Sequence, residues 1–288
     1  MNDAAEASYA SPNNALRISK LLIFCWNKSE TKGEIPLHEK RWRDYEMTVN
    51  GLPQRIRYNE ATVEGLFLPL LHRLAALQAE KGGRLLVFLA APPATGKSTL
   101  LLFLEQLARQ HEELTRVQPL GMDGFHHPNR YLETHTILRD GVEIALKSIK
   151  GAPETFDVAL LAAKLRAAKE GATPFPVYDR RIHDVVPDAL IADAPILLIE
   201  GNWLLLDEDP WRDLRALADY TLRIDAPPAF LRDRLIARKV QGGGSEAEAT
   251  AFYDASDRKN VERFIAHAGR ADEVWQMAAD GDFVVVTQ

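Results

Sequence analysis

The chain has 288 residues, of which 46% are hydrophobic and 26% are charged, as in an ordinary globular protein with a sizeable core. Its net charge of −6 and its pI of about 5.8 argue against a broad basic face for nucleic acid. The single cysteine, Cys25, excludes an intramolecular disulfide, and no apolar run reaches the ~20 residues of a membrane span. The first residues lack the pattern of a secretion signal, so we expect a cytoplasmic protein without nucleic-acid or membrane partners.

In chain order, residues 1–45 are expected to form a peripheral N-terminal extension and residues 46–288 a single domain. The domain opens with Asn50-Gly51 between alternating residues, which is a hairpin signal. Apolar residues at helical spacing then predict a helix over 60–80, which Pro69 is expected to kink.

Short apolar runs separated by helical patterns make up the rest of the chain. Strands are predicted over 84–90, 117–123, 194–201 and 219–226. Helices are predicted over 97–110, 156–168, 230–240 and 246–267. Strands that alternate with helices predict an α/β fold, with a doubly wound parallel sheet flanked by helices.

The first of these strands runs into a loop that is typical of phosphate binding. The general pattern is G-x-x-x-x-G-K-[ST], and this chain keeps Gly96, Lys97 and Ser98 but has Ala91 at the first glycine position. Backbone N–H groups and the helix N-terminus would receive the phosphates, Lys97 the outer phosphates and Ser98 the Mg²⁺. A chance match in a turn is the alternative, which the strand and helix on either side disfavour. ATP is therefore expected on Ala91, Pro92, Pro93, Ala94, Thr95, Gly96, Lys97, Ser98 and Thr99.

Four further motifs follow the loop: GMDGFHHPN from Gly121, KGAPETFD from Lys150, PFPVYDRRIHDVVPD from Pro174 and ILLIEGNWLLL from Ile196. With the loop, they resemble the phosphoribulokinase/uridine kinase superfamily of P-loop kinases. Type I pantothenate kinase and bacterial proteins labelled fructose-transport or nucleoside/nucleotide kinases are the nearest parallels. The resemblance runs from about Glu46 to near the C-terminus. It implies a P-loop NTPase fold with a helical lid and a substrate-side hairpin.

Two carboxylates are expected at the carboxyl ends of strands, where ligands of such sheets bind. The side chain of Asp123 can take the proton of an attacking hydroxyl or cap a turn, and the resemblance implies the catalytic role. Glu200 ends a buried strand, where a carboxylate holds Mg²⁺ in P-loop proteins. An unpaired buried carboxylate is costly, which favours the metal role for Glu200.

The acceptor side is expected to be formed by residues of the other motifs. The resemblance implies that Asp157 binds substrate hydroxyls, although an acidic residue in the first turn of a helix has a structural role as well. It also implies that Tyr178 and His183 line the acceptor pocket, and Asn202 is expected to shape it. Arg180 stands where pantothenate kinase has a histidine, a departure from that enzyme. An arginine here can bind an anionic substrate or lie on a solvated strand.

The helix over 230–240 resembles the lid of these kinases. Arg234 and Arg238 lie four residues apart and therefore on one face. Arg234 is expected to bind the nucleotide, and Arg238 to offset charge on the transferred phosphoryl group. Pairing with acidic neighbours is the alternative for both.

These expectations define an ATP-dependent small-molecule kinase that uses ATP and Mg²⁺. Its acceptor would be an alcohol of a sugar, a nucleoside or a pantothenate-like compound. A homodimer is also expected, because related kinases are often oligomers. A regulatory GTPase-type switch is the alternative, for which Asn27-Lys28-Ser29 superficially resembles a guanine-reading motif. A kinase-like binding protein without turnover is a third class, favoured only by Ala91 and Ala94.

Overall fold

The computed structural model describes residues 40–49, 52–139 and 141–286, and these belong to one compact unit that begins at Lys40. Strand β1 (Trp42–Val49) pairs antiparallel with β2 (Leu52–Asn59). The hairpin predicted here is therefore present, although its turn residues Asn50 and Gly51 lie outside the described residues. Strand β1 also begins ahead of the boundary expected after residue 45. Cys25 and the segment at Asn27 lie outside the described residues as well.

A six-stranded sheet forms the centre of the described unit, in the order β12-β11-β10-β3-β9-β4. Five of its strands are parallel, and β12 pairs antiparallel with β11 at one edge. The strands are β3 (Leu85–Ala90), β4 (Val117–Gly121), β9 (Ile196–Gly201), β10 (Tyr220–Asp225), β11 (Glu273–Met277) and β12 (Phe283–Val285). The predicted fold class, a P-loop NTPase α/β sheet flanked by helices, is confirmed.

The helices are α1 (Glu60–Thr62), α2 (Leu68–Lys81), α3 (Lys97–Gln110), α4 (Asn129–Thr134), α5 (Val158–Glu170), α6 (Pro228–Gln241), α7 (Glu246–Phe252) and α8 (Arg258–His267). The continuous helix expected over 60–80 is wrong in detail, because a π-helical segment, Val63–Phe67, separates α1 from α2. Pro69 lies just beyond this segment and has no N–H with which to continue the α-helical hydrogen bonds. A second π-helical segment, Tyr253–Asp257, separates α7 from α8.

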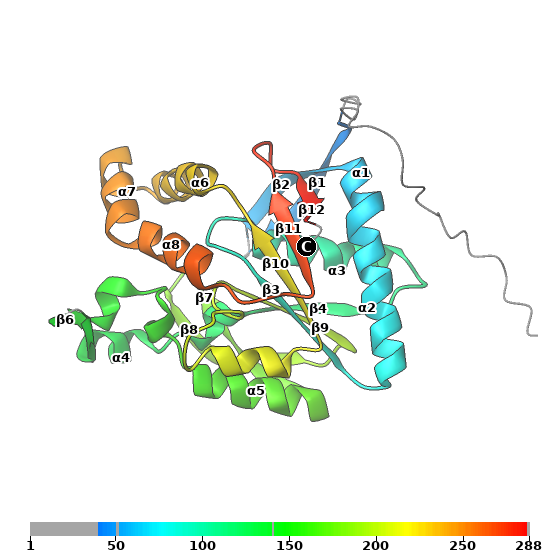
Figure 1. Cartoon of the computed structure of the whole chain (residues 1–288), viewed down its shortest axis with the longest axis horizontal. Coiled ribbons are helices and arrows are strands. Elements are labelled where there is room, and N and C mark those ends of the chain that lie inside the picture. Colours follow the sequence, from blue (N-terminus) through cyan, green and yellow to red (C-terminus); the bar gives the residue numbers. More distant parts are fainter. Residues whose placement is uncertain (1–39, 50–51, 140, 287–288) are drawn as a thin grey trace, which may run out of the picture. The chain divides into compact units, whose positions relative to one another are not determined.

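Both faces of the sheet are covered by apolar residues, as Figure 1 shows for the helices on either side. Along β3, Leu85, Val87 and Leu89 pack with α2 and α3, whereas the residues between them pack against the layer that contains α5. A strand buried on both faces reads as a continuous apolar run, which explains the sequence of β3. None of the helices in the described part of the chain is long and apolar enough to cross a membrane.

Besides β1–β2, two further hairpins are separate from the central sheet. The first consists of β5 (Thr136–Arg139) and β6 (Val142–Ala145). The second consists of β7 (Thr173–Asp179) and β8 (Asp184–Ala192) and contains the motif for which a substrate-side hairpin is expected.

Candidate active site

The phosphate loop connects β3 to α3 at the carboxyl edge of the sheet. Gly96 caps α3 with a φ of 88°, and Ala94 has a φ of 66°. The Thr95 hydroxyl donates to the Pro92 carbonyl at 3.0 Å and so closes the loop on itself. The loop thus has left-handed backbone at two positions, one of which is an alanine rather than a glycine.

Lys97 lies in the first turn of α3 with its ammonium group inside the loop. The Nζ atom donates to the carbonyl oxygens of Ala91 and Pro92, both at 3.1 Å, and to Oδ1 of Asn202 at 2.6 Å. Burial lowers the pKa of Lys97, and the negative charges of Glu200 and Asp123 oppose this shift. A nucleotide phosphate at this position would stabilise the charged lysine in the same way.

Ser98 and Glu200 meet where β9 ends beside the loop. The Ser98 hydroxyl donates to Oε1 of Glu200 at 2.6 Å. Burial raises the pKa of Glu200, and the charge of Lys97 opposes this effect. Hydroxyl and carboxylate oxygens are ligands that Mg²⁺ accepts. The described residues contain no group of three or more His, Cys, Asp or Glu side chains that could hold a metal ion by themselves.

Asp123 follows β4 in a short 3₁₀ segment, Met122–Phe125, and its carboxylate is 47% exposed. Close packing fixes this segment on both sides. A Cβ atom at Gly124 would collide with the Pro176 carbonyl of β7, and one at Gly201 would lie 2.6 Å from the Met122 side chain. The glycines therefore allow β7 and β9 to hold the backbone that carries Asp123.

The hairpin β7–β8 brings two more predicted residues to this edge. A guanidinium nitrogen of Arg180 lies 3.8 Å from Oδ2 of Asp123. The ring of Tyr178 lies 5.5 Å from that of His126. Burial raises the pKa of Tyr178, and the negative charge of Asp123 raises it further. By contrast, Arg181 lies in the turn after β7, and its guanidinium pairs with Asp179 of that strand at 2.6 Å.

Asp157 and His183 have structural roles in the fold, and that of Asp157 at a helix start agrees with the alternative given for it above. Asp157 caps α5 by accepting from the Leu160 N–H at 2.8 Å, while its own N–H donates to the Phe125 carbonyl. His183 has a φ of 52°, and its carbonyl oxygen accepts from Asn129 Nδ2 at 2.8 Å and from Lys150 Nζ at 2.9 Å. The side chain of His183 itself is exposed.

Of the three arginines of α6, Arg234 lies against the loop and Arg238 lies one helical turn further along. A Cβ atom at Gly96 would be 3.6 Å from Nη2 of Arg234, which places that guanidinium against the loop. Burial lowers the pKa of Arg234 and of Arg238, and the charges of Asp257 and Asp123 act in the opposite direction at Arg238. Neither arginine has a carboxylate within 4.0 Å among the described residues.

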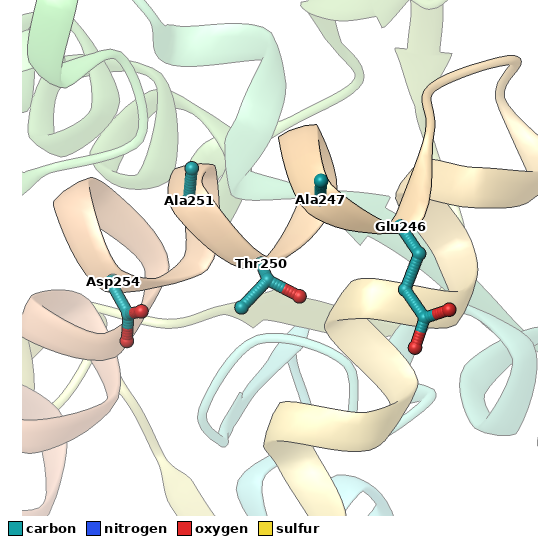
Figure 2. Close-up of a pocket in the computed structure, with 5 residues that line it drawn as sticks. All are labelled: Glu246, Ala247, Thr250, Ala251 and Asp254. Carbon is teal, nitrogen blue, oxygen red and sulfur yellow. The ribbon is translucent and has the colours of Figure 1, made fainter.

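The structure thus joins the loop, Asn202, Glu200, Asp123 and Arg180 into one constellation. Sequence reasoning missed Asn129 and Lys150, which sit inside the quoted motifs and bind the tip of the β7–β8 hairpin. A separate surface hollow on α7, shown in Figure 2, is lined by Glu246, Ala247, Thr250, Ala251 and Asp254. None of those five side chains is basic, so this hollow is not suited to nucleotide phosphates.

Comparison with known proteins identifies the family to which this constellation belongs. The model of the Phosphoribulokinase / Uridine kinase family matches residues 86–278, which include the loop, Asp123 and Glu200. The chain belongs to this family. A protein of Escherichia coli (strain K12) named "Uncharacterized protein YggC" is 46% identical over 239 residues, covering 83% of this chain and 97% of that protein.

More distant relatives of the family are similar over much of the chain. The pantothenate kinase of Levilactobacillus brevis is 25% identical over 81% of this chain and 76% of its own length. A solved structure described as a "putative fructose transport system kinase" from Silicibacter sp. TM1040 has a TM-score of 0.65 and 33% identity. It covers 74% of this chain and 98% of that one. The kinase family predicted from the motifs is confirmed, and the protein is an ATP-dependent phosphotransferase with an alcohol as acceptor.

Proposed function

We propose that the protein transfers the γ-phosphoryl group of ATP to an alcohol of a sugar, a nucleoside or a pantothenate-like compound. One observation carries this proposal: three neighbouring strands, β3, β9 and β4, end in the loop, in Glu200 and in Asp123. In the register of the sheet Gly121 pairs with Glu200, and Ala90 pairs with Gly201. Groups for the nucleotide, the metal and the acceptor therefore lie in sequence along one edge.

The chemistry needs an aligned hydroxyl and a stabilised phosphoryl group. The acceptor oxygen forms a bond to the γ-phosphorus, the bond from that phosphorus to the bridging β,γ oxygen breaks, and ADP leaves. Asp123 holds the attacking hydroxyl and takes its proton. Lys97 and Arg238 offset the negative charge that spreads over the phosphoryl oxygens, and Arg234 binds the nucleotide beside the loop.

The loop residues Ala91–Thr99 cradle the phosphates through backbone N–H groups. Ser98 and Glu200 would hold Mg²⁺, which neutralises phosphate charge when bound. Their 2.6 Å hydrogen bond shows that both oxygens reach the same small region. Asn202 accepts a hydrogen bond from the Lys97 ammonium. When phosphate binds, this hydrogen bond would break, or the ammonium would donate to both Asn202 and the phosphate.

The acceptor side consists of the hairpin β7–β8 and the segment before α5. Arg180 lies 3.8 Å from Asp123, Tyr178 belongs to the same hairpin, and both would line the acceptor pocket. The second carboxylate oxygen of Asp157 is available for a substrate hydroxyl while the first caps α5. His183 would contribute its exposed ring at the hairpin tip.

An acceptor screen tests this function. ADP release is measured with sugars, nucleosides and pantothenate for the native chain, Asp123→Asn and Asp188→Asn. Asp188 is an exposed residue of the same hairpin and pairs with Lys164, so its variant controls for loss of one carboxylate. We expect acceptor-stimulated ADP release that Asp123→Asn lowers at least about a hundredfold, as loss of a general base does. ADP release that no acceptor stimulates would instead favour a regulatory NTPase.

A further inference from the structure

Two lysines of the protein are held in the same unusual way. The ammonium of Lys97 is bound by two backbone carbonyls and the amide oxygen of Asn202. The ammonium of Lys150 is bound by the amide oxygen of Asn129 at 2.8 Å and by the His183 carbonyl at 2.9 Å. In the described ranges, neither ammonium has a carboxylate within 4.0 Å.

Five other lysines differ from this pair by contacting a carboxylate, whereas Lys239 lies over the Phe252 ring and Lys259 is exposed. Within the part of the chain that the structure describes, the lysines that contact a carboxylate are Lys40, Lys81, Lys147, Lys164 and Lys169. Partly buried charges are normally compensated by an opposite charge, because neutral oxygens replace only part of the lost hydration. For Lys97 the missing negative charge is that of the nucleotide phosphate. The same reasoning indicates that Lys150 binds an anion that the protein chain itself does not supply.

Lys150 is half-buried, and nearby positive charge adds to its need for a counter-ion. Burial lowers the pKa of Lys150, and the charge of Lys147 lowers it further. Lys147 donates to the same oxygen of Asn129, at 2.8 Å, so two ammonium groups share one neutral acceptor. The carboxylates of Asp184, Asp123 and Glu133 oppose the shift from beyond ion-pair distance.

The position of Lys150 places this charge on the acceptor side of the site. Its Nζ atom lies 4.7 Å from the centre of the Tyr178 ring, and that ring faces His126 at 5.5 Å. Nδ1 of His126 lies 2.9 Å from the backbone carbonyl oxygen of Asp123, so contacts run from Lys150 through Tyr178 and His126 to Asp123. An anion at Lys150 would therefore belong to the molecule whose hydroxyl meets Asp123.

We infer that Lys150 is the anion-binding residue of the acceptor subsite and that the acceptor is an alcohol carrying a phosphate or a carboxylate group. This inference rests on the proposed kinase function and makes it more specific. Asn129 would fix the ammonium, since its backbone N–H also donates to Asp184 and its amide to the His183 carbonyl. Neutral sugars and nucleosides would leave Lys150 without its anion.

The test uses pairs of acceptors that differ only in the charged group: ribose with ribose 5-phosphate, fructose with fructose 6-phosphate, and pantothenol with pantothenate. The first two pairs report on phosphate and the third on carboxylate. We expect a charged member to have a kcat/KM at least about tenfold above that of its neutral partner, since hydrogen bonds to charged groups contribute that order of free energy. Better turnover of the neutral members would overturn the inference and leave the kinase function standing.

Variants locate the effect at Lys150. Lys150→Met should remove most of the preference for the charged acceptor by raising its KM, and Lys150→Arg should restore part of it. Lys169→Met, at the other end of α5 beside Asp219, is the matched control and should keep the preference. An equal loss for both members of a pair in Lys150→Met would mean a structural role only, and would contradict the inference.

A binding measurement decides the anion site without turnover. The protein is saturated with a non-hydrolysable ATP analogue and Mg²⁺, which fill the loop, and inorganic phosphate is titrated by calorimetry. We expect phosphate to bind the native chain and to bind Lys150→Met at least about tenfold more weakly. Equal phosphate affinity in both proteins would refute the anion site, whereas failure of every acceptor to stimulate ADP release would refute the kinase function instead.

Discussion

The two alanines of the phosphate loop should respond in different ways to replacement by glycine. Ala94 has a φ of 66°, a backbone conformation that costs an alanine about 1–2 kcal/mol. Ala91 is not among the described non-glycine residues of positive φ, and its side chain is fully buried in the core beside α3. Glycine therefore relieves strain at one position and removes packing at the other.

The expected magnitudes follow from these environments. At either position glycine adds freedom to the unfolded chain, which costs about 0.4–1 kcal/mol. Relief of about 1–2 kcal/mol of strain offsets this cost for Ala94→Gly, so its free energy of unfolding should be unchanged or higher by up to about 1.5 kcal/mol. Ala91→Gly also loses a buried methyl group, worth about 0.8 kcal/mol, and should be destabilised by about 1–2 kcal/mol.

Urea unfolding measures both free energies, and calorimetry with ATP measures the affinity. Both variants should keep ATP affinity within about tenfold, or ~1.4 kcal/mol, because Gly96, Lys97 and Ser98 are unchanged. Equal destabilisation by the two substitutions would refute the reasoning from backbone conformation. A larger loss of affinity would show that the alanines take part in phosphate binding.

Two further substitutions test the metal site and the anchoring of the N-terminal hairpin. Glu200→Gln should raise the Mg²⁺ concentration for half-maximal ADP release by about tenfold or more, and an unchanged Mg²⁺ dependence would remove Glu200 from the metal site. Burial opposes ionisation of Asp282, but hydrogen bonds from Thr62, Asn59 and Lys40 outweigh it and lower its pKa. This carboxylate therefore stabilises the fold above its unfolded pKa of about 3.9, and the stability is lost as the pH falls through the folded value. Asp282→Asn should cost about 1–3 kcal/mol at pH 7, with a smaller difference from the native chain below pH 4, and a gap independent of pH would contradict this reasoning.

The nucleotide side of the site can be predicted from the sequence because the residues that form it are consecutive in the chain. A buried strand, the Gly96-Lys97-Ser98 triplet and a helix are consecutive, and their order alone places phosphates at the N-terminus of α3. The positions of Asp123 and Glu200 are predicted in the same way, since each follows an apolar run that forms a parallel strand, whereas the catalytic role of Asp123 is inferred from the family resemblance.

The acceptor side could not be predicted as fully, because its contacts join distant segments. Asn129, Lys150 and His183 meet only when α4, the segment before α5 and the β7–β8 hairpin are in place. The partner of Lys97 is a second example, since Asn202 lies more than a hundred residues away in the chain. The π-helical segment before Pro69 was not predicted either, because the helical spacing of apolar residues continues through it.

Transfer of label from [γ-³²P]ATP tests the central claim most directly. The native chain, Mg²⁺ and each acceptor are incubated, and the phosphorylated acceptor is separated from inorganic phosphate. The proposed mechanism predicts label in the acceptor, formed together with an equal amount of ADP and reduced at least about a hundredfold by Asp123→Asn. Label that appears only as inorganic phosphate, or full transfer by Asp123→Asn, would contradict it.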